Sequence, residues 1–364
     1  MGSGMACIGS AAMVPWVHAA NVSAGIRQGA ARPVTRTRSA IVDVRRIWDR
    51  APSHQYPDIT RFGDSWFVVC READMFGSGG SGTVRVIRSG DEGVTWEPVA
   101  LFTSPRVSDA ADQKKKMIDL RDPKIAVNGD RELMVTAFDC NTRENPEKYP
   151  FQTLAWFSPD GANWSCPHEI GDAGTIIWRI TWHQGKGYSL AYHGGIYVST
   201  DGSGREFRKV GDCGVAGSES AVVFWQDDEL DWIAHAIFRY SSNAHVGIAY
   251  PPYTDWEWKA LGVPIGGPDM IALPDGRMVT VVRLYDGHLP PPIGCPEYGR
   301  TTSLCWVDPY HGTMHEFLTL PAGGRGHAYG GLAWHDGFLW VVYFSAHEVW
   351  QGKKQSIYLA KVVL

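Results

Sequence analysis

Residues that could perform chemistry recur at two positions of a two-strand pattern that repeats along this sequence of 364 residues. Charged or aromatic residues begin the first predicted strand of a repeat or end the second. The starting positions hold Asp58, Arg121, Asp122, Trp178, Arg179, Glu219, Asp269 and Tyr329, and the ending positions hold Arg71, Glu72, Asp139, His193, Arg239, Arg283, His347 and Glu348. Charged groups gathered in one pocket lose hydration energy unless they pair or bind a ligand. We therefore expect these carboxylates and arginines to form a functional site.

The elements that position these residues are short runs of Val, Ile, Trp, Phe and Tyr bounded by Gly, Asp and Pro. After residue 40 no segment keeps a helical periodicity over the length that a helix needs, which indicates an all-β chain. Pairs of such runs occur six times, in the ranges 57–69, 122–135, 178–188, 219–233, 269–279 and 329–340. Six units predict a six-bladed β-propeller, whose first strands line the axis and start at one face; a two-sheet sandwich is the alternative.

Both ends of the propeller region read as strands. One lies at 41–47, before the first unit, and the other lies at 356–363. We expect one terminus to complete a blade begun by the other, because this arrangement ties the ring shut and leaves only short edges. Residues 41–364 are therefore assigned to the propeller. Residues 1–40 are assigned to a leader, either disordered or a weak secretory signal.

A turn motif, Ser-x-Asp-x-Gly-x-Thr-Trp, runs from Ser89 to Trp96, and weaker copies begin at Ser158 and Ser199. Asp91 can accept hydrogen bonds from nearby backbone N–H groups, which suits a tight hairpin. We place these turns between the third and fourth strands of their blades, on the outer side of the ring. The range 250–256 is predicted to be a degenerate copy, with a sugar-stacking rim as the alternative.

The turn motif and the sixfold pattern together resemble the sialidase superfamily, whose members are six-bladed propellers with Asp-box turns. The resemblance covers nearly everything after residue 40. In that family a Tyr that begins the last blade is the nucleophile, and a Glu in the fourth blade polarises it. The resemblance implies these roles for Tyr329, in His-Ala-Tyr-Gly-Gly-Leu, and Glu219, in Gly-Ser-Glu-Ser. A phenol has a pKa of about 10, so a nearby carboxylate must draw off its proton before it attacks.

The same resemblance implies residues that hold the substrate. The family binds a substrate carboxylate through arginines, which Arg71, Arg239 and Arg283 resemble by position. Asp122, in Arg-Asp-Pro, matches an acidic position in the second blade. Further candidates for substrate contact on the same face are Arg121, Arg179 and Asp269.

The first-blade motif Arg-Ile-Pro of the family is missing. The matching stretch is Tyr56-Pro57-Asp58-Ile59, which puts Asp58 near the position of the expected arginine. An acidic group at that position would repel the carboxylate that the arginines are expected to bind. For the acid/base of the reaction, position favours Asp74 first and Asp58 second.

The sequence and the resemblance together predict a sialidase-like glycoside hydrolase that removes a terminal acidic sugar, sialic acid or a related one. A polysaccharide lyase acting on uronic acids and a non-catalytic glycan-binding propeller are the alternatives. The formal net charge of -5 does not suggest a nucleic-acid partner, and no apolar run is long enough to span a membrane. No cofactor is expected, and no metal site, because the histidines lack ligand spacing.

Two further expectations concern the compartment and the cysteines. The leader slightly favours a secreted or periplasmic protein, and a cytoplasmic one is not excluded. The seven cysteines show no CxxC pair and are read mostly as free or buried thiols. A disulfide between Cys140 and Cys166 is the alternative left open.

Overall fold

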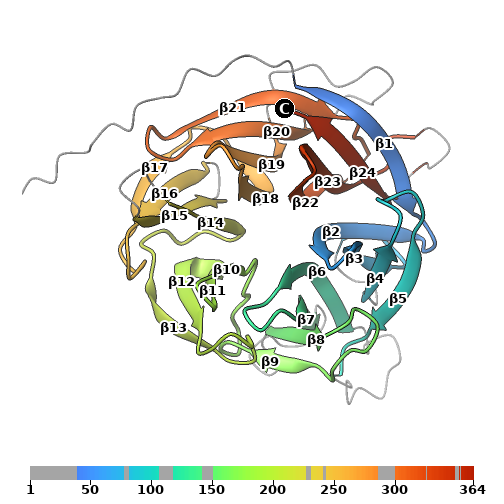
Figure 1. Cartoon of the computed structure of the whole chain (residues 1–364), viewed down its shortest axis with the longest axis horizontal. Coiled ribbons are helices and arrows are strands. Elements are labelled where there is room, and N and C mark those ends of the chain that lie inside the picture. Colours follow the sequence, from blue (N-terminus) through green and yellow to red (C-terminus); the bar gives the residue numbers. More distant parts are fainter. Residues whose placement is uncertain are drawn as a thin grey trace, which may run out of the picture. The chain divides into compact units, whose positions relative to one another are not determined.

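The strands in the described part of the chain form six four-stranded antiparallel sheets, which are arranged as the blades of a ring (Figure 1). The computed structural model describes residues 39–77, 82–105, 118–141, 151–226, 231–240, 243–285, 300–324, 326–348, 352 and 354–364. The predicted leader lies almost wholly outside these ranges. The predicted six-bladed propeller is confirmed.

Each blade is a meander whose first strand lies nearest the centre (Figure 1). Blade I contains β2 (Ser53–Phe62), β3 (Ser65–Ala73), β4 (Thr83–Ser89) and β5 (Glu97–Phe102). Blade II contains β6 (Ile118–Val127), β7 (Leu133–Asn141), β8 (Gln152–Ser158) and β9 (His168–Ile170). Blade III contains β10 (Thr181–His183), β11 (Lys186–Leu190), β12 (Gly195–Ser199) and β13 (Phe207–Asp212), with a 3-10 turn, η2 (Tyr192–Gly194), after β11.

The other three blades repeat this order. Blade IV contains β14 (Ser220–Gln226), β15 (Trp232–Phe238), β16 (His245–Ala249) and β17 (Glu257–Ala260). Blade V contains β18 (Ile265–Ala272), β19 (Met278–Leu284), β20 (Thr301–Asp308) and β21 (Thr313–Leu320). Blade VI contains β22 (Ala328–His335), β23 (Phe338–Ser345), β24 (Ser356–Val363) and β1 (Ala40–Trp48).

Blade VI combines both ends of the propeller. Its outermost strand, β1, pairs with β24 in an antiparallel register that runs from Ala40 opposite Val363 to Trp48 opposite Ile357. The expected closure of the ring by the two termini is confirmed. Because the first and last strands share one sheet, the ring has no open break between its ends.

The inner strands of blades I, II, V and VI share a β-bulge, which falls on Tyr56, Asp122, Gly267 and Tyr329 and on the residue after each of them. These four residues have positive φ angles of 54°, 48°, 57° and 45°. In three of the strands the next residue is proline, which has no N–H to give to a sheet, so the pairing must skip there.

The bulges correct the predicted strand starts. β2 begins at Ser53 and β18 at Ile265, so Asp58 and Asp269 lie inside their strands, directly after the bulge. Each of these two aspartates therefore lies further inside the channel than the strand start at which the sequence had placed it.

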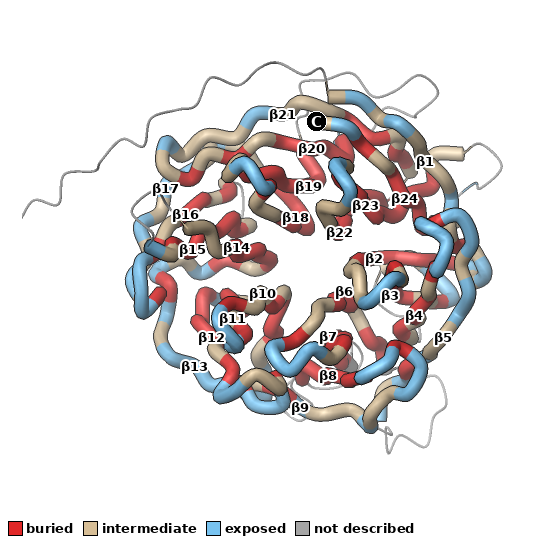
Figure 2. Tube along the Cα trace, in the orientation of Figure 1, coloured by how far each residue is buried: buried red, intermediate tan, exposed pale blue. Residues whose placement is uncertain are grey.

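Apolar side chains from neighbouring sheets fill the spaces between the blades. Figure 2 shows buried residues along the inner strands and exposed residues at the turns between strands and on the outermost strands. One cluster contains Trp48, Trp66, Trp178, Tyr329 and Trp340. The candidate nucleophile is thus anchored in the hydrophobic core.

The turn from Ser89 to Trp96 joins the third and fourth strands of blade I, as predicted. Asp91 Oδ1 accepts hydrogen bonds from the Ser89 hydroxyl at 2.7 Å and from the Thr95 N–H at 2.9 Å. Its Oδ2 accepts one from the Thr95 hydroxyl at 2.6 Å. The turns that contain Asp160 and Asp201 occupy the corresponding places in blades II and III.

Replacing Asp91 by alanine is expected to lower the melting temperature at neutral pH and to leave any enzymatic activity unchanged. The hydrogen bonds from Thr95 and Ser89 lower the pKa of Asp91 to about 2. An unfolded aspartate has a pKa of about 3.9, so the stabilisation is complete above that pH and is lost as the pH falls toward 2. Thermal melts of both proteins should therefore converge between about pH 4 and pH 2. A folded but inactive variant would contradict this structural role.

Candidate functional site

Tyr329 and Glu219 form a hydrogen-bonded pair across the channel mouth. Tyr329 follows the first residue of β22, and Glu219 immediately precedes β14. The Tyr329 hydroxyl donates to Glu219 Oε1 at 2.9 Å, and the Gly267 N–H donates to Glu219 Oε2 at 2.7 Å. A Cβ atom on Gly267 would lie 2.3 Å from Tyr329 Cγ. Glycine at this bulge therefore makes room for the tyrosine ring.

The environment keeps the Tyr329 phenol protonated. Burial and the nearby Glu219 carboxylate raise its pKa well above the usual value, whereas Arg283 and Arg239 act in the opposite direction. Its proton is already directed at Glu219. The carboxylate can therefore accept that proton as the phenol oxygen attacks, which is the arrangement of an activated nucleophile and its base.

Two arginines flank Tyr329. Arg239 Nη1 donates to Glu219 Oε1 at 2.6 Å and to the Tyr329 hydroxyl oxygen at 2.8 Å. The guanidinium carbon of Arg283 lies 4.6 Å from the centre of the Tyr329 ring. Arg283 also donates from Nε and Nη2 to the backbone carbonyl of His327. Two cations therefore lie close to the Tyr329 side chain.

The structure places Arg71 differently from these two arginines. Arg71 is fully buried, and its Nε and Nη2 each lie 2.7 Å from Asp119 Oδ1. Asp119 thus offsets the charge of Arg71, while the Nη1 atom of Arg71 has no hydrogen-bond partner among the described residues. The predicted contact between Arg71 and a substrate carboxylate stays a prediction, but the geometry favours a supporting role.

Asp122, Arg121 and Tyr56 lie on the blade I and II side of the site. Tyr56 packs edge-on against Tyr329, with ring centres 5.2 Å apart. The Tyr56 hydroxyl accepts a hydrogen bond from Arg121 Nη2 at 3.4 Å. Asp122 is buried, and its Oδ1 has no hydrogen-bond partner among the described residues. Tyr56, in the bulge, therefore lies beside Tyr329.

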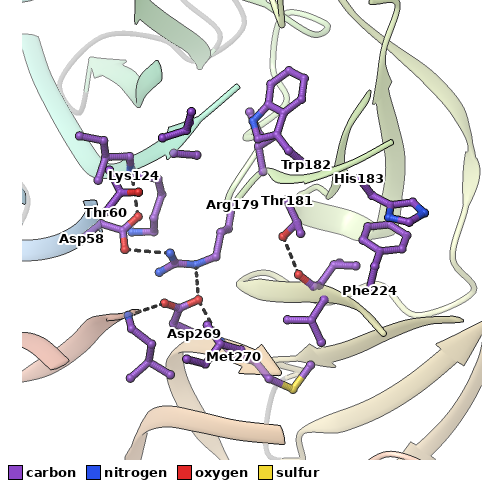
Figure 3. Close-up of a pocket in the computed structure, with 18 of the residues that line it drawn as sticks. Asp58, Thr60, Lys124, Arg179, Thr181, Trp182, His183, Phe224, Asp269 and Met270 are labelled. Atoms are coloured by element: carbon purple, nitrogen blue, oxygen red, sulfur yellow. Dashed lines mark hydrogen bonds and ion pairs between the residues drawn. The ribbon is translucent and has the colours of Figure 1, made fainter. Parts of the chain in front are cut away.

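Asp58, Arg179 and Asp269 instead form an ion cluster on the axis (Figure 3). Arg179 lies between the two carboxylates, with Nη1 2.9 Å from Asp58 Oδ1 and Nε 3.1 Å from Asp269 Oδ1. The Ile125 N–H donates a hydrogen bond to Asp58 Oδ2, and the Leu332 N–H donates one to Asp269 Oδ2. The cluster therefore connects the inner strands of blades I, II, V and VI with Arg179, which lies two residues before β10 of blade III. Arg179 pairs with the charge of Asp58.

Burial also shifts the pKa values within this cluster. It raises the pKa of Asp269 to about 6, against the lowering effect of Arg179. It lowers the pKa of the neighbouring Lys124 to about 8, and the charge of Arg179 adds to that effect. Figure 3 shows Lys124 beside Asp58. The hydrogen bonds and ion pairs of the cluster indicate a structural function.

A cavity of about 660 Å³ occupies the channel beyond this cluster. Its walls continue along the inner strands through Thr60, Ala126, Thr181 and Val222, and Tyr329 and Glu219 are not among its lining residues. The ion cluster thus separates the cavity from the Tyr329–Glu219 pair.

The remaining sequence predictions have the following outcomes. Asp74 lies one residue beyond β3 and is exposed. Cys140 and Cys166 are free thiols, so the disulfide between them is not present. The described residues include no group of three His, Cys, Asp or Glu side chains that could hold a metal ion. Within the same ranges no helix has the length and apolar character needed to cross a membrane.

Sequence reasoning missed two tyrosines of the site, Tyr56 and Tyr192. The pKa of Tyr192 is raised by burial first, and then by the charges of Glu219, Asp122 and Tyr329. Tyr192 lies in the η2 turn rather than in a strand. For Tyr56, the Pro57 that follows it was the available signal, because Asp122 and Gly267 also precede prolines in the corresponding strands.

Comparisons with solved structures agree with the propeller fold. No family model matches the sequence, and no curated protein matches it either. A protein of unknown function from Dyadobacter fermentans has a TM-score of 0.68 at 14% identity, over 90% of this chain and 100% of that chain. The Trypanosoma rangeli sialidase has a TM-score of 0.59 at 13% identity, over 85% of this chain and 55% of that chain. This chain has the sialidase-type propeller fold.

The same fold occurs in a second kind of glycoside hydrolase. The alpha-L-arabinanase of Penicillium chrysogenum, whose structure contains arabinobiose, has a TM-score of 0.59 at 13% identity, over 88% of this chain and 98% of that chain. At such identities the likeness establishes the fold alone. The chain spans about half the length of the Trypanosoma rangeli sialidase.

Proposed function

We propose that this protein is a retaining glycoside hydrolase that uses Tyr329 as nucleophile and Glu219 as the base that activates it. The observation that carries the proposal is the 2.9 Å hydrogen bond from the Tyr329 hydroxyl to Glu219, with Arg239 bonded to both groups. Sialidases are the exception among glycosidases in using a Tyr nucleophile. The sialidase-type fold supports the same assignment.

In the first step, the Tyr329 oxygen attacks the anomeric carbon while Glu219 takes the phenol proton. The glycosidic bond breaks, and the leaving oxygen receives a proton from a general acid. Arg239 stabilises the developing charge on the phenol oxygen, because its Nη1 lies 2.8 Å away. Water then cleaves the bond between the sugar and Tyr329, and Glu219 returns the proton to the tyrosine. Two displacements at one carbon retain its configuration.

The arginines indicate the kind of sugar. Arg239 and Arg283 both contact Tyr329, so a carboxylate bound between them lies next to the attacking oxygen. In a 2-ulosonic acid such as sialic acid, the carboxylate is attached to the anomeric carbon itself. In a uronic acid, it is attached to C5, which is separated from the anomeric carbon by the ring oxygen. The position of the arginines therefore favours a terminal sialic acid or a related ulosonic acid as substrate.

Covalent trapping tests this proposal. The sialidase of Trypanosoma rangeli forms a covalent intermediate with 2,3-difluorosialic acid. Incubation of this protein with the same compound should add one sugar mass, which peptide mapping should locate on Tyr329. Tyr329→Phe should gain no mass. Hydrolysis of sialosides by the native protein without any adduct, or an adduct on another residue, would exclude Tyr329 as nucleophile. An unsaturated, ultraviolet-absorbing product from a uronic-acid glycan would instead identify a lyase.

A further inference from the structure

The side chain of Asp122 is a carboxyl group that has no role in the Tyr329–Glu219 mechanism as described so far. It lies in the bulge of β6, at the position that Tyr329 holds in β22 and Tyr56 holds in β2. Its φ of 48° is in the left-handed region, which aspartate tolerates better than most residues but still at a cost. Strained backbone of this kind is typical of functional positions. Asp122 and Tyr329 thus occupy equivalent bulge positions on the inner strands of their blades.

The carboxyl of Asp122 is buried without being satisfied. Its residue is 8% exposed, and Oδ1 has no hydrogen-bond partner among the described residues. A buried acceptor that lacks a partner is costly to the fold, unless it carries a proton or meets a ligand. The site therefore contains a carboxyl group ready to exchange a proton with a bound molecule.

The surroundings of Asp122 are those of the reactive centre. The titratable groups that act on it or are acted on by it are Arg121 and Lys124 of β6, Arg71 of β3, Tyr56 of β2, Cys140 of β7, Glu219 before β14, Tyr192 of η2 and Tyr329 of β22. Burial raises the pKa of Asp122 to about 6; Arg121 and Lys124 act against this rise, and Glu219 adds to it. A proton is thus held on Asp122 at mildly acidic pH.

We propose that Asp122 is the general acid/base of the reaction. The inference rests on the proposed function, since it names the group that completes the Tyr329 mechanism. In the first step, Asp122 gives its proton to the glycosidic oxygen as the bond from that oxygen to the anomeric carbon breaks. In the second step, the Asp122 carboxylate takes a proton from the attacking water as the bond to Tyr329 breaks. Each turnover consumes one water and returns Asp122 to its protonated form.

The two aspartates favoured by the sequence are less suited to this task. Both oxygens of Asp58 are occupied, one by Arg179 and the other by the Ile125 N–H. Asp74 is exposed, one residue beyond β3. A general acid needs a proton at the working pH and access to the leaving oxygen. Asp122 combines burial beside the pair with an unpartnered oxygen.

Leaving-group dependence tests the proposal. Asp122→Asn keeps the size and the left-handed backbone but cannot give a proton. With the methyl glycoside of sialic acid, whose leaving group needs protonation, the variant should lose about 10²- to 10⁴-fold in kcat/KM. With the 4-methylumbelliferyl glycoside, whose leaving group departs without a proton, the loss should be less than about 10-fold. Azide, which needs no base, should restore breakdown of the covalent intermediate and give the glycosyl azide.

Asp74→Asn is the matched control, because it makes the same chemical change at the competing position. Its kcat/KM with each of the two glycosides should equal that of the native protein. Equal losses with both glycosides in Asp122→Asn would show that Asp122 only holds the sugar. If Asp74→Asn instead lost activity with the methyl glycoside but not with the 4-methylumbelliferyl glycoside, the general acid would be Asp74. Either result would overturn the proposal while leaving Tyr329 as nucleophile.

A second measurement needs no substrate and so separates this proposal from the proposed function. Carbon NMR of protein labelled at the aspartate carboxyl carbons should show a resonance that titrates near pH 6 and is missing from Asp122→Asn. A resonance that titrates below about pH 4 would show Asp122 to be an ordinary ionised carboxylate. That result would exclude it as the acid even if no sialoside were hydrolysed.

Discussion

Replacing Tyr329 by phenylalanine is expected to reduce kcat by about 10³-fold or more, while the protein folds as before. The substitution removes only the oxygen that attacks the anomeric carbon. The ring keeps its contacts with Tyr56 and Trp178, and Glu219 keeps its hydrogen bonds from Arg239 and the Gly267 N–H. The loss should appear in kcat measured with the 4-methylumbelliferyl glycoside of sialic acid, with a native melting temperature.

Tyr343→Phe is the matched control for this variant. Tyr343 lies in β23 of the same blade, is fully buried, and donates its hydroxyl proton to the Pro321 carbonyl at 2.9 Å. Its loss should affect stability and leave kcat unchanged. Native activity in Tyr329→Phe would remove the tyrosine mechanism altogether. Equal activity losses in both variants would show a general effect of losing a buried hydroxyl.

Replacing Arg179 by leucine is expected to lower the free energy of unfolding at neutral pH by about 3 to 5 kcal/mol, because it leaves two buried carboxylates without their cation. Asp58 and Asp269 are 1% and 4% exposed, so their charges are poorly hydrated in the folded protein. The loss should be measured by urea unfolding. It affects several blades at once, since the cluster also holds the N–H groups of Ile125 and Leu332.

The same variant should become more sensitive to pH. The folded-state pKa of Asp269, about 6, already exceeds the value of about 3.9 in an unfolded chain. A carboxyl with a raised pKa favours the folded state at low pH, and this advantage is lost as the pH rises through the folded-state pKa. Removing Arg179 raises that pKa further. The stability deficit of Arg179→Leu should therefore be smaller at pH 5 than at pH 8.

Arg208→Leu provides the comparison for this effect. Arg208 lies in β13 of blade III and pairs with Glu206, but both side chains are more than half exposed. Surface ion pairs contribute less than about 1 kcal/mol, so this variant should unfold almost like the native protein. An equally small loss in Arg179→Leu would show that water or a rearranged Lys124 satisfies the two aspartates.

The sequence by itself determined the architecture and the placing of Tyr329 and Glu219 at one face of the ring. Short apolar runs and turn residues are local signals that predict strands and hairpins. Their sixfold repetition predicts a six-bladed propeller. The closure by β1 and β24 followed from a strand pattern at each terminus. Tyr329 and Glu219 could be placed together because each stands at the start of an inner strand, and inner strands of a propeller begin at one face.

Only the tertiary structure decided which charged groups meet. Pro57, Pro123 and Pro268 each sit in a bulge, and these bulges bring Tyr56 and Asp122 to the site and move Asp58 and Asp269 deeper into the channel. The pairing of Arg71 with Asp119, and of Arg179 with Asp58 and Asp269, depends on distances between different blades. Such distances depend on how whole sheets pack around the axis. A local pattern of residues in the sequence does not contain this information.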